Sequence, residues 1–255
     1  MNEKAFFDAI RRRLFKRGLR QEQVDGINGI LHAFVTHGDR REKTLAYALA
    51  TAYHETGRKM APVREGFAKT DAGARRIVRH RKYGKAEPPY GHVYYGRGQV
   101  QLTWKENYRR SSPDAGADLV RYPDKALDPV IGARILIKGL IDGRWNGRGK
   151  GIAHYLPDHG RDDLKNARRT VNITDKWQSI GGYYSHFLAA IRAAGGVPES
   201  AYQPVIAVKA PSTAPEAAQE HGALVAALAA LLVALGAALG VTSPELLGQV
   251  MEALP

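Results

Sequence analysis

A change of composition near residue 197 constrains the fold of this chain more than any other feature. Beyond it, residues 222–241 contain only glycine, alanine, leucine and valine, and the next charged residue is Glu245. A helix of about 20 apolar residues is long enough to cross a bilayer. The segment before it is rich in proline and small residues, as linkers are. We therefore predict three parts: a domain at 1–196, a linker at 197–221 and an apolar C-terminal segment at 222–255.

Two interpretations of residues 222–241 remain open from composition. The segment is apolar on all sides, which is typical of a helix inserted in a membrane. An alanine-rich helix packed on a core, or on its copies in an oligomer, would have the same composition. We favour membrane contact because the segment follows a linker and has no polar stripe.

Charge divides the chain at the same place. Residues 1–196 carry 37 Lys and Arg against 20 Asp and Glu, a formal charge of +17, whereas residues 197–255 carry −4. A domain this basic favours a polyanionic partner: nucleic acid, an anionic membrane face or an acidic wall polymer. We expect no nucleic acid, because no zinc-finger, RNP or helix-turn-helix signature stands out. The chain has no cysteine, which excludes disulfides and thiolate metal sites.

Apolar residues recur at helical spacing through the first domain and predict a mainly α-helical fold. The expected helices lie within 1–19, 20–37, 43–56, 129–142, 162–171 and 175–194, with Gly57 ending the third and Pro129 opening the fourth. Between them, residues 64–92 are basic and rich in glycine and proline, which predicts a long loop with one short helix. Loops of this length are often functional.

The N-terminal segment is charged throughout and lacks the apolar core of a signal peptide. Its apolar side chains (Phe6, Phe7, Ile10, Leu14 and Phe15) share one side of a basic helix. We expect this helix to dock on the domain core, the alternative being a helix that lies on a membrane surface. Without a signal peptide, access to an external substrate would depend on a holin or on the apolar tail.

Two glutamates are candidates for acid and base chemistry. Glu55 lies in the last turn of the helix at 43–56, where the negative end of the dipole disfavours ionisation and raises a carboxyl pKa. Glu65 follows in the loop, where Arg58 and Arg64 are near in sequence and favour its ionised form. Carboxyls pushed in opposite directions suggest an acid and a base. Two surface glutamates in a basic protein remain the alternative.

The motif His54-Glu-Thr-Gly also resembles the start of a zinc-protease signature. That signature needs a second histidine four residues after the first, where this chain has Arg58. The other histidines show no paired ligand spacing, so we predict no metal and no other cofactor.

The stretch YYGRGQVQLTW (94–104) combines aromatic rings with hydrogen-bonding side chains. Its alternation predicts an extended segment with Gln99, Gln101 and Thr103 on a polar face, and Val100, Leu102 and Trp104 on a buried one. Thr103 followed by Glu106 resembles a capping box, so Thr103 is either a helix N-cap or a hydroxyl that holds a water molecule. The tyrosines and Trp104 offer flat surfaces to sugar rings.

Together these motifs resemble the family 19 glycoside hydrolases, which include plant-type chitinases and phage endolysins. The resemblance is carried by HETG with Glu65, by YYGRGQVQLTWKENY (94–108) and by ARRTVNITD (167–175), within residues 5–195. The segment FFDAIRRRLF…QEQVDGINGIL (6–31) is similar to the phage lysins. The resemblance implies a lysozyme-like α-helical fold with a deep cleft. Ile173 stands where the family usually has glycine.

By this resemblance Glu55 is the general acid, Glu65 the general base, and Thr103 positions the nucleophilic water. The mechanism implied is inverting hydrolysis, with the two carboxyls roughly 6.5–9.5 Å apart to admit that water. The candidate substrate-binding residues are His54, Tyr95, Arg97, Gln101, Trp104, Asn107 and Asn172.

The expected substrate is peptidoglycan, because its lactyl and peptide carboxylates suit a basic domain; chitin is the alternative. A phage-type endolysin made in the cytoplasm of a host bacterium would act on the periplasmic wall, aided by a holin and by membrane contact through 222–241. The sequence leaves open which glycosidic bond is cut. A non-catalytic wall-binding or nucleic-acid-binding protein is the remaining alternative.

Overall fold

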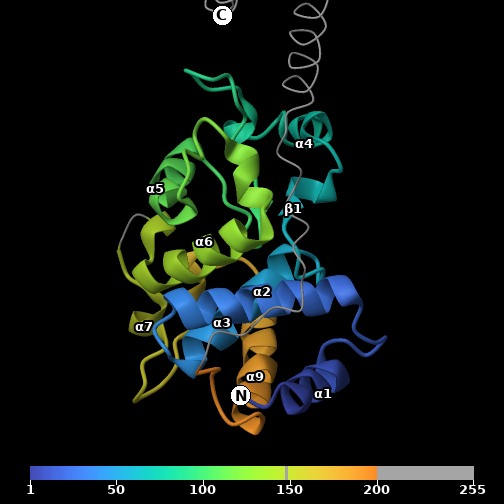
Figure 1. The fold of residues 1–255 in the computed structure, drawn as a ribbon. Coiled ribbons are helices and arrows are strands. Elements are labelled where there is room, and N and C mark those ends of the chain that lie inside the picture. Colours follow the sequence, from blue (N-terminus) through green and yellow to red (C-terminus); the bar gives the residue numbers. More distant parts are fainter. Residues whose placement is uncertain (147–148, 200–255) are drawn as a thin grey trace, which may run out of the picture. The chain divides into compact units, whose positions relative to one another are not determined.

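A computed structural model describes residues 1–146 and 149–199, most of which lie in helices (Figure 1). The prediction of a mainly α-helical fold is confirmed for this part of the chain. The predicted linker and the apolar segment 222–241 lie outside it, apart from residues 197–199. Within the described ranges, no helix has both the length and the hydropathy required to cross a membrane.

The elements follow one another along the chain with short 3-10 turns (η) between them. The α-helices are α1 (Glu3–Arg13), α2 (Gln21–His37), α3 (Glu42–Glu55), α4 (Asp71–Val78), α5 (Lys105–Ala115), α6 (Pro129–Asp142), α7 (Ile152–Tyr155), α8 (Leu164–Ala167) and α9 (Trp177–Ala193). The 3-10 turns are η1 (Glu65–Phe67), η2 (Lys82–Gly84), η3 (Pro123–Leu127), η4 (Arg144–Asn146) and η5 (Arg168–Thr170). Two short strands, β1 (Val63–Arg64) and β2 (Arg97–Gly98), pair antiparallel.

Helix α3 forms the centre of the core and packs along α9 (Figure 1). From Leu45 to Tyr53 every side chain is buried, and four of these residues are alanine, which lets neighbouring helices approach closely. A helix that is buried on all sides is held rigidly by its surroundings. Its last residue is Glu55, and Gly57 follows with a φ of +56°, as predicted for a C-terminal stop.

The N-terminal helix α1 docks on the core, as expected, rather than presenting its apolar side to solvent. It packs on α9 and buries Phe6 and Ile10 completely. Asn2 caps its first turn by accepting a hydrogen bond from the backbone N–H of Ala5. The membrane-surface interpretation of this helix is therefore wrong for the folded domain.

Residues 64–92 form a long excursion with one short α-helix, as the sequence predicted. Thr70 caps α4, which packs against η1 and contributes Ala74 and Val78 to a second small apolar cluster. The excursion carries Glu65 at its start and Tyr83 in η2. It thereby brings these two side chains to the same place on the domain.

The predicted alternation of residues 98–104 is confirmed for Val100 and Leu102, which are buried, and is wrong at its two ends. Gln99 is buried and Trp104 is 45% exposed, the reverse of the expected faces. The chain turns instead of extending, since Gln101 and Trp104 adopt φ values of +53° and +74°. Residues with a Cβ rarely adopt positive φ values. At these two positions the backbone turns, so side chains no longer alternate between two faces as they do in an extended strand. The N-cap of α5 is Trp104 and not Thr103, whose hydroxyl donates to the carbonyl oxygen of Gln101.

Candidate active site

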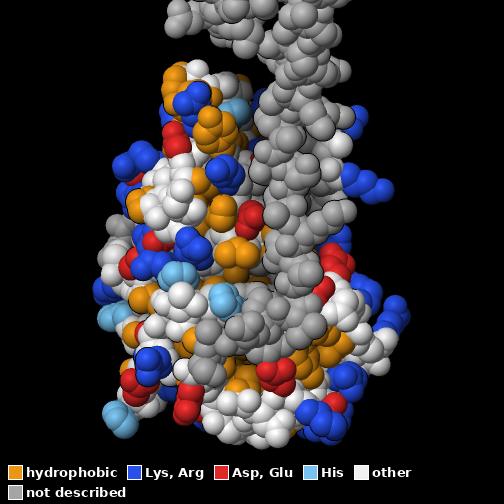
Figure 2. All heavy atoms as spheres, in the orientation of Figure 1, with side chains coloured by type: hydrophobic (Ala, Val, Ile, Leu, Met, Phe, Trp, Pro, Cys, Tyr) orange, Lys and Arg blue, Asp and Glu red, His pale blue; other side chains and the backbone are white. Residues whose placement is uncertain are grey.

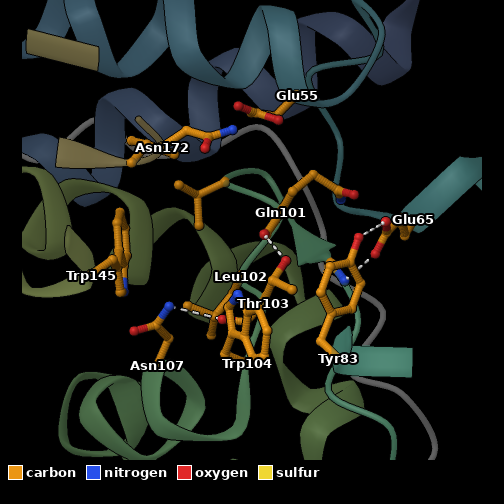
Figure 3. A pocket seen from close by; sticks show the side chains of 13 residues that line it. Glu55, Glu65, Tyr83, Gln101, Leu102, Thr103, Trp104, Asn107, Trp145 and Asn172 are labelled. Atoms are coloured by element: carbon orange, nitrogen blue, oxygen red, sulfur yellow. Dashed lines mark hydrogen bonds between the residues drawn. The ribbon is translucent and has the colours of Figure 1, made fainter. Parts of the chain in front are cut away.

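A cleft of about 320 Å³ lies where the end of α3, the excursion after it, the 96–107 segment and the loop after η5 meet (Figure 3). Its lining residues are Glu55, Glu65, Tyr83, Gly96, Val100, Gln101, Leu102, Thr103, Trp104, Asn107, Trp145, Val171 and Asn172. Seven of the ten predicted site residues are among them. Figure 3 shows Glu55 and Asn172 on one side of the cleft, facing Thr103 and Asn107 on the other.

Glu55 enters the cleft from the rigid end of α3. Its side chain is 15% exposed, and its Oε1 accepts a hydrogen bond from Nη2 of Arg168 at 2.7 Å. The Arg168 side chain is only 2% exposed. A buried positive charge therefore faces Glu55, so the helix dipole considered in the sequence analysis is not the only electrostatic influence on this side chain. Sequence reasoning missed the partner because it lies 113 residues away.

Arg168 also ties Glu55 to the loop that carries Asn172. Its Nε donates to the carbonyl oxygen of Asp175, and its own carbonyl oxygen accepts from the backbone N–H of Asn172. One buried side chain therefore fixes the positions of two cleft residues. Arg168 belongs to the segment ARRTVNITD (167–175), which carried the family resemblance. Its positive charge was the only sequence signal that it could pair with a carboxylate.

Glu65 is held by two donors. Its Oε1 accepts from the hydroxyl of Tyr83 at 2.6 Å, and its Oε2 accepts from the backbone N–H of Gly96 at 2.8 Å (Figure 3). Burial and the bond to Glu65 both raise the pKa of Tyr83, so its phenol stays protonated and donates. The predicted partners do not make this contact: Arg64 pairs with Asp124, and Arg58 lies over the ring of Tyr53.

Thr103, Gln101 and Asn107 form a hydrogen-bonded wall. The Thr103 hydroxyl donates to the carbonyl oxygen of Gln101, and the Asn107 amide donates to the carbonyl oxygen of Thr103 (Figure 3). The Gln101 amide in turn donates to the carbonyl oxygen of Val63 in β1. A hydroxyl that has given its proton keeps acceptor lone pairs, so Thr103 can still accept a hydrogen bond from a water molecule in the cleft.

Three aromatic side chains surround this wall. The rings of Tyr83 and Trp104 meet edge to face at 5.4 Å between centroids. Trp145 stands across the cleft from Tyr83 in Figure 3, fixed by a hydrogen bond from its Nε1 to Ser111. Flat rings with polar edges suit the faces of sugar rings. Sequence reasoning named only Trp104, because nothing in the local sequence relates Tyr83 or Trp145 to the other motifs.

Three predicted substrate-binding residues do not line the cleft. Arg97 is 1% exposed, with its guanidinium bonded to Asp124, Asp71 and the Tyr108 hydroxyl. Tyr95 is fully buried, with its ring 3.6 Å from the Arg97 guanidinium carbon. Both side chains are buried beside residues that line the cleft and do not line it themselves. His54 lies beside the ring of Tyr183, and burial lowers its pKa so that it is neutral at pH 7.

The described residues contain no group of three His, Cys, Asp or Glu side chains arranged to hold a metal ion. The side chains that line the cleft offer carboxyl, hydroxyl, amide and aromatic groups. Its two carboxyls come from separate elements and are held by different donors, one a guanidinium and the other a phenol with a backbone amide.

Comparison with known families bears on the same segment. Residues 26–139, somewhat less than half of the chain, match the family model described as class I chitinase, Glyco_hydro_19. These residues contain Glu55, Glu65 and Thr103. Residues 26–139 are thus similar to the family 19 glycoside hydrolases. Arg168 and Asn172 lie beyond the matched residues.

Individual relatives match over shorter lengths. The chain is 33% identical to endochitinase 1 of Theobroma cacao over 107 residues, covering 39% of this chain and 33% of that protein. It is 29% identical to inactive chitinase-like protein 1 of Hevea brasiliensis, over 50% of this chain and 48% of that protein. The crystal structure of a bacterial family 19 chitinase aligns with this chain at a TM-score of 0.49 and 21% identity. The alignment covers 78% of this chain and 96% of the chitinase chain. The chain thus spans about a third to a half of the plant relatives' length.

Proposed function

We propose that this protein hydrolyses the β-1,4 glycosidic bonds of peptidoglycan by an inverting acid/base mechanism. The observation that carries the proposal is the meeting of Glu55 and Glu65 in one cleft within a family 19 segment. They come from different elements and approach from different sides of the cleft (Figure 3). Hydrolysis by inversion uses two carboxyls on opposite sides of the scissile bond, with room for a water molecule between the sugar and the base.

Glu55 acts as the general acid in this proposal and donates its proton to the glycosidic oxygen. The carboxylate that remains gains the full ion pair with Arg168, so the interaction strengthens as the bond breaks. Glu65 takes a proton from the attacking water, and Thr103 accepts a second hydrogen bond from that water. Tyr83 and Gly96 keep the Glu65 carboxylate oriented throughout.

Peptidoglycan is the proposed polymer because of charge. Both peptidoglycan and chitin contain β-1,4-linked N-acetylhexosamines, but only peptidoglycan carries carboxylates along the strand. The first 196 residues carry +17, and Figure 2 shows lysine and arginine side chains over much of the face drawn. An anionic polymer would be steered to such a surface, with a strong dependence on salt. Chitin is the second candidate, because several plant relatives are named endochitinases.

The biological role proposed is that of a phage endolysin that lyses its host. The enzyme would be made in the bacterial cytoplasm and act on the periplasmic wall, reaching it through a holin or through membrane contact by residues 222–241. The resemblance of residues 6–31 to phage lysins and the apolar composition of 222–241 support this role. Membrane contact is tested by flotation with liposomes, where deleting 222–255 should abolish the association.

A non-catalytic wall-binding protein is the competing class, since the Hevea relative is named inactive. Purified full-length protein incubated with peptidoglycan sacculi and with chitin decides between these functions. We expect new reducing ends from sacculi, with slower or no release from chitin. Mass analysis of the fragments then identifies whether the muramic acid or the glucosamine bond is cut. Absence of product from both polymers would exclude the hydrolase.

A further inference from the structure

A second cavity lies outside the cleft and is larger, at about 860 Å³. The loop between α1 and α2, the end of α3 and the first half of α9 form its walls. We call it the basic pocket; among its lining residues are Arg13, Lys16, Arg17, Arg20, Tyr53 and Arg58. No residue lines both the pocket and the cleft.

The charge of the basic pocket has one sign. Five of its lining residues are arginine or lysine, and no aspartate or glutamate in the described part of the chain lines it. Arg13, Lys16, Arg17, Arg20 and Arg58 also take part in none of the ion pairs found within residues 1–146 and 149–199. By contrast, Arg11 pairs with Asp8 in α1, the helix that ends at Arg13. Like charges gathered in a concave surface raise its potential and attract anions.

The walls of the basic pocket are tied together by hydrogen bonds. The Tyr53 hydroxyl donates to the carbonyl oxygen of Leu14, which joins α3 to the residues that follow α1. The buried side chain of Gln23 donates to the carbonyl oxygen of Arg58, which joins α2 to the end of α3. Arg58 has a φ of +71°, a conformation that costs energy for a residue with a Cβ and that clusters at functional sites.

The pocket and the cleft meet the same turn of α3 from different sides. Tyr53 and Arg58 line the pocket, whereas Glu55, between them in sequence, lines the cleft. The ring of Tyr183, which lines the pocket, also lies 6.4 Å from that of His54, the neighbour of Glu55. The cleft and the pocket are therefore neighbours along residues 53–58 of the chain.

We propose that the basic pocket binds the carboxylates of the peptide branches of the strand that is cut in the cleft. Arginine presents paired N–H donors that match a carboxylate in a bidentate manner, and four of the five cations are arginine. The identity of the polymer rests on the proposed function, whereas the preference for oxyanions follows from the pocket alone. Chitin, which lacks carboxylates, would gain nothing from it.

The test is co-sedimentation of the full-length chain with insoluble sacculi, using Glu55→Gln as background so that binding is measured without cleavage. Arg17→Glu with Arg20→Glu reverses two exposed pocket charges. Arg161→Glu with Lys165→Glu, exposed residues that line neither the cleft nor the pocket, makes the same change in net charge. We expect about tenfold weaker binding for the first pair and less than about twofold for the second. Arg17→Gln with Arg20→Gln, a milder pair, should weaken binding about threefold.

Sacculi whose carboxyls are converted to amides form the second arm. On these amidated sacculi, the Glu55→Gln chain with wild-type pocket residues should bind no more tightly than the same chain carrying Arg17→Glu and Arg20→Glu. Equal losses in the pocket and control pairs, or unchanged binding to amidated sacculi, would overturn the proposal. The proposal would also be overturned if Arg17→Glu with Arg20→Glu weakened binding to double-stranded DNA and left binding to sacculi unchanged. A failure of the proposed function would show separately, as absence of product from the wild-type enzyme.

Discussion

At the scale of single residues, the cleft depends on partners that local sequence does not reveal. Glu55 could be placed at a helix end from periodicity alone, and its acidity was argued from the dipole. The structure adds Arg168, a buried guanidinium 2.7 Å from Glu55 Oε1. Glu65 was expected to meet Arg58 or Arg64 and instead meets Tyr83 and Gly96. Neighbours in sequence were poor guides because both arginines already have other partners in the fold.

The first prediction concerns Arg168. Replacing it by alanine removes the partner of the Glu55 carboxylate. It also removes the side-chain bond to the carbonyl oxygen of Asp175, which holds the loop that carries Asn172. We expect the rate of hydrolysis to fall at least about 100-fold and the free energy of unfolding to fall by about 3–5 kcal/mol. Arg168→Lys should recover part of the stability and little of the rate. Arg169→Ala is the control, since the Arg169 side chain donates to Asn166 and lies outside the cleft lining; a loss as large in this variant would contradict the account.

The second prediction concerns Tyr83. In Tyr83→Phe the Glu65 carboxylate keeps its bond from Gly96 and loses the 2.6 Å bond from the phenol. The carboxylate of the base is then held by one donor instead of two, so the rate of hydrolysis at pH 7 should fall about tenfold. Tyr90→Phe, an exposed tyrosine outside the cleft lining, should keep the wild-type rate. A wild-type rate in Tyr83→Phe would contradict a role for this bond in orienting Glu65.

At the scale of elements, regular helices were predictable and the turns that build the cleft were not. The helices 21–37, 42–55 and 129–142 follow from apolar spacing, capping residues and stop glycines. The segment after β2 was misread because Gln101 and Trp104 have positive φ values that no local propensity indicates. Their backbone is held by long-range contacts, such as the bond from Gln101 to Val63. The cleft residues of this segment could be named from resemblance, and their geometry could not.

The third prediction tests how α6 supports the cleft. A Cβ on Gly139 would lie 2.0 Å from Cζ2 of Trp145, so Gly139→Ala must displace the indole that lines the cleft. We expect a loss of about 1–3 kcal/mol in the free energy of unfolding and a raised KM for the glycan. Gly29→Ala in α2 meets nothing within 4 Å and should stabilise the domain by about 0.5–1 kcal/mol. Thermal unfolding and steady-state kinetics measure both, and an unaltered KM in Gly139→Ala would mean that Trp145 does not contact substrate.

The fourth prediction concerns the ion pairs that Asp124 makes with Arg64 and Arg97. Burial alone would raise the pKa of Asp124, but hydrogen bonds from Arg64 and Arg97 bring it below its ordinary value. A carboxyl with a lowered pKa stabilises the fold above its unfolded pKa and loses that contribution as the pH falls through the folded value. Asp124→Asn should therefore cost about 1–3 kcal/mol at pH 7 and progressively less below about pH 4.

The control for this pH dependence is Asp25→Asn, at a carboxyl outside the ion pairs described. Chemical denaturation at pH 7 and pH 3 gives the two free-energy differences. A cost for Asp124→Asn that stays constant between these pH values would contradict the assignment of Asp124 as an ionised partner of Arg97.

At the scale of the whole molecule, charge and topology point to the same activity. A rigid apolar helix delivers Glu55 to a cleft and a polar excursion delivers Glu65, while the +17 charge of residues 1–196 is the basis on which an anionic polymer is proposed as substrate. The charge division at residue 197 was visible in the sequence, and so was the pairing of two glutamates within a family pattern. The basic pocket was not, because its walls come from helices far apart in sequence.

The central claim is that Glu55 supplies the proton for cleavage of a glycan bond in this cleft. Release of reducing ends from peptidoglycan sacculi, measured for the full-length wild type, Glu55→Gln and Glu22→Gln, tests it most directly. Gln still accepts a hydrogen bond from Arg168, while Glu22 is exposed on α2 and outside the cleft. We predict a loss of about 100-fold or more for Glu55→Gln and wild-type activity for Glu22→Gln. Equal activity in all three proteins would contradict the account.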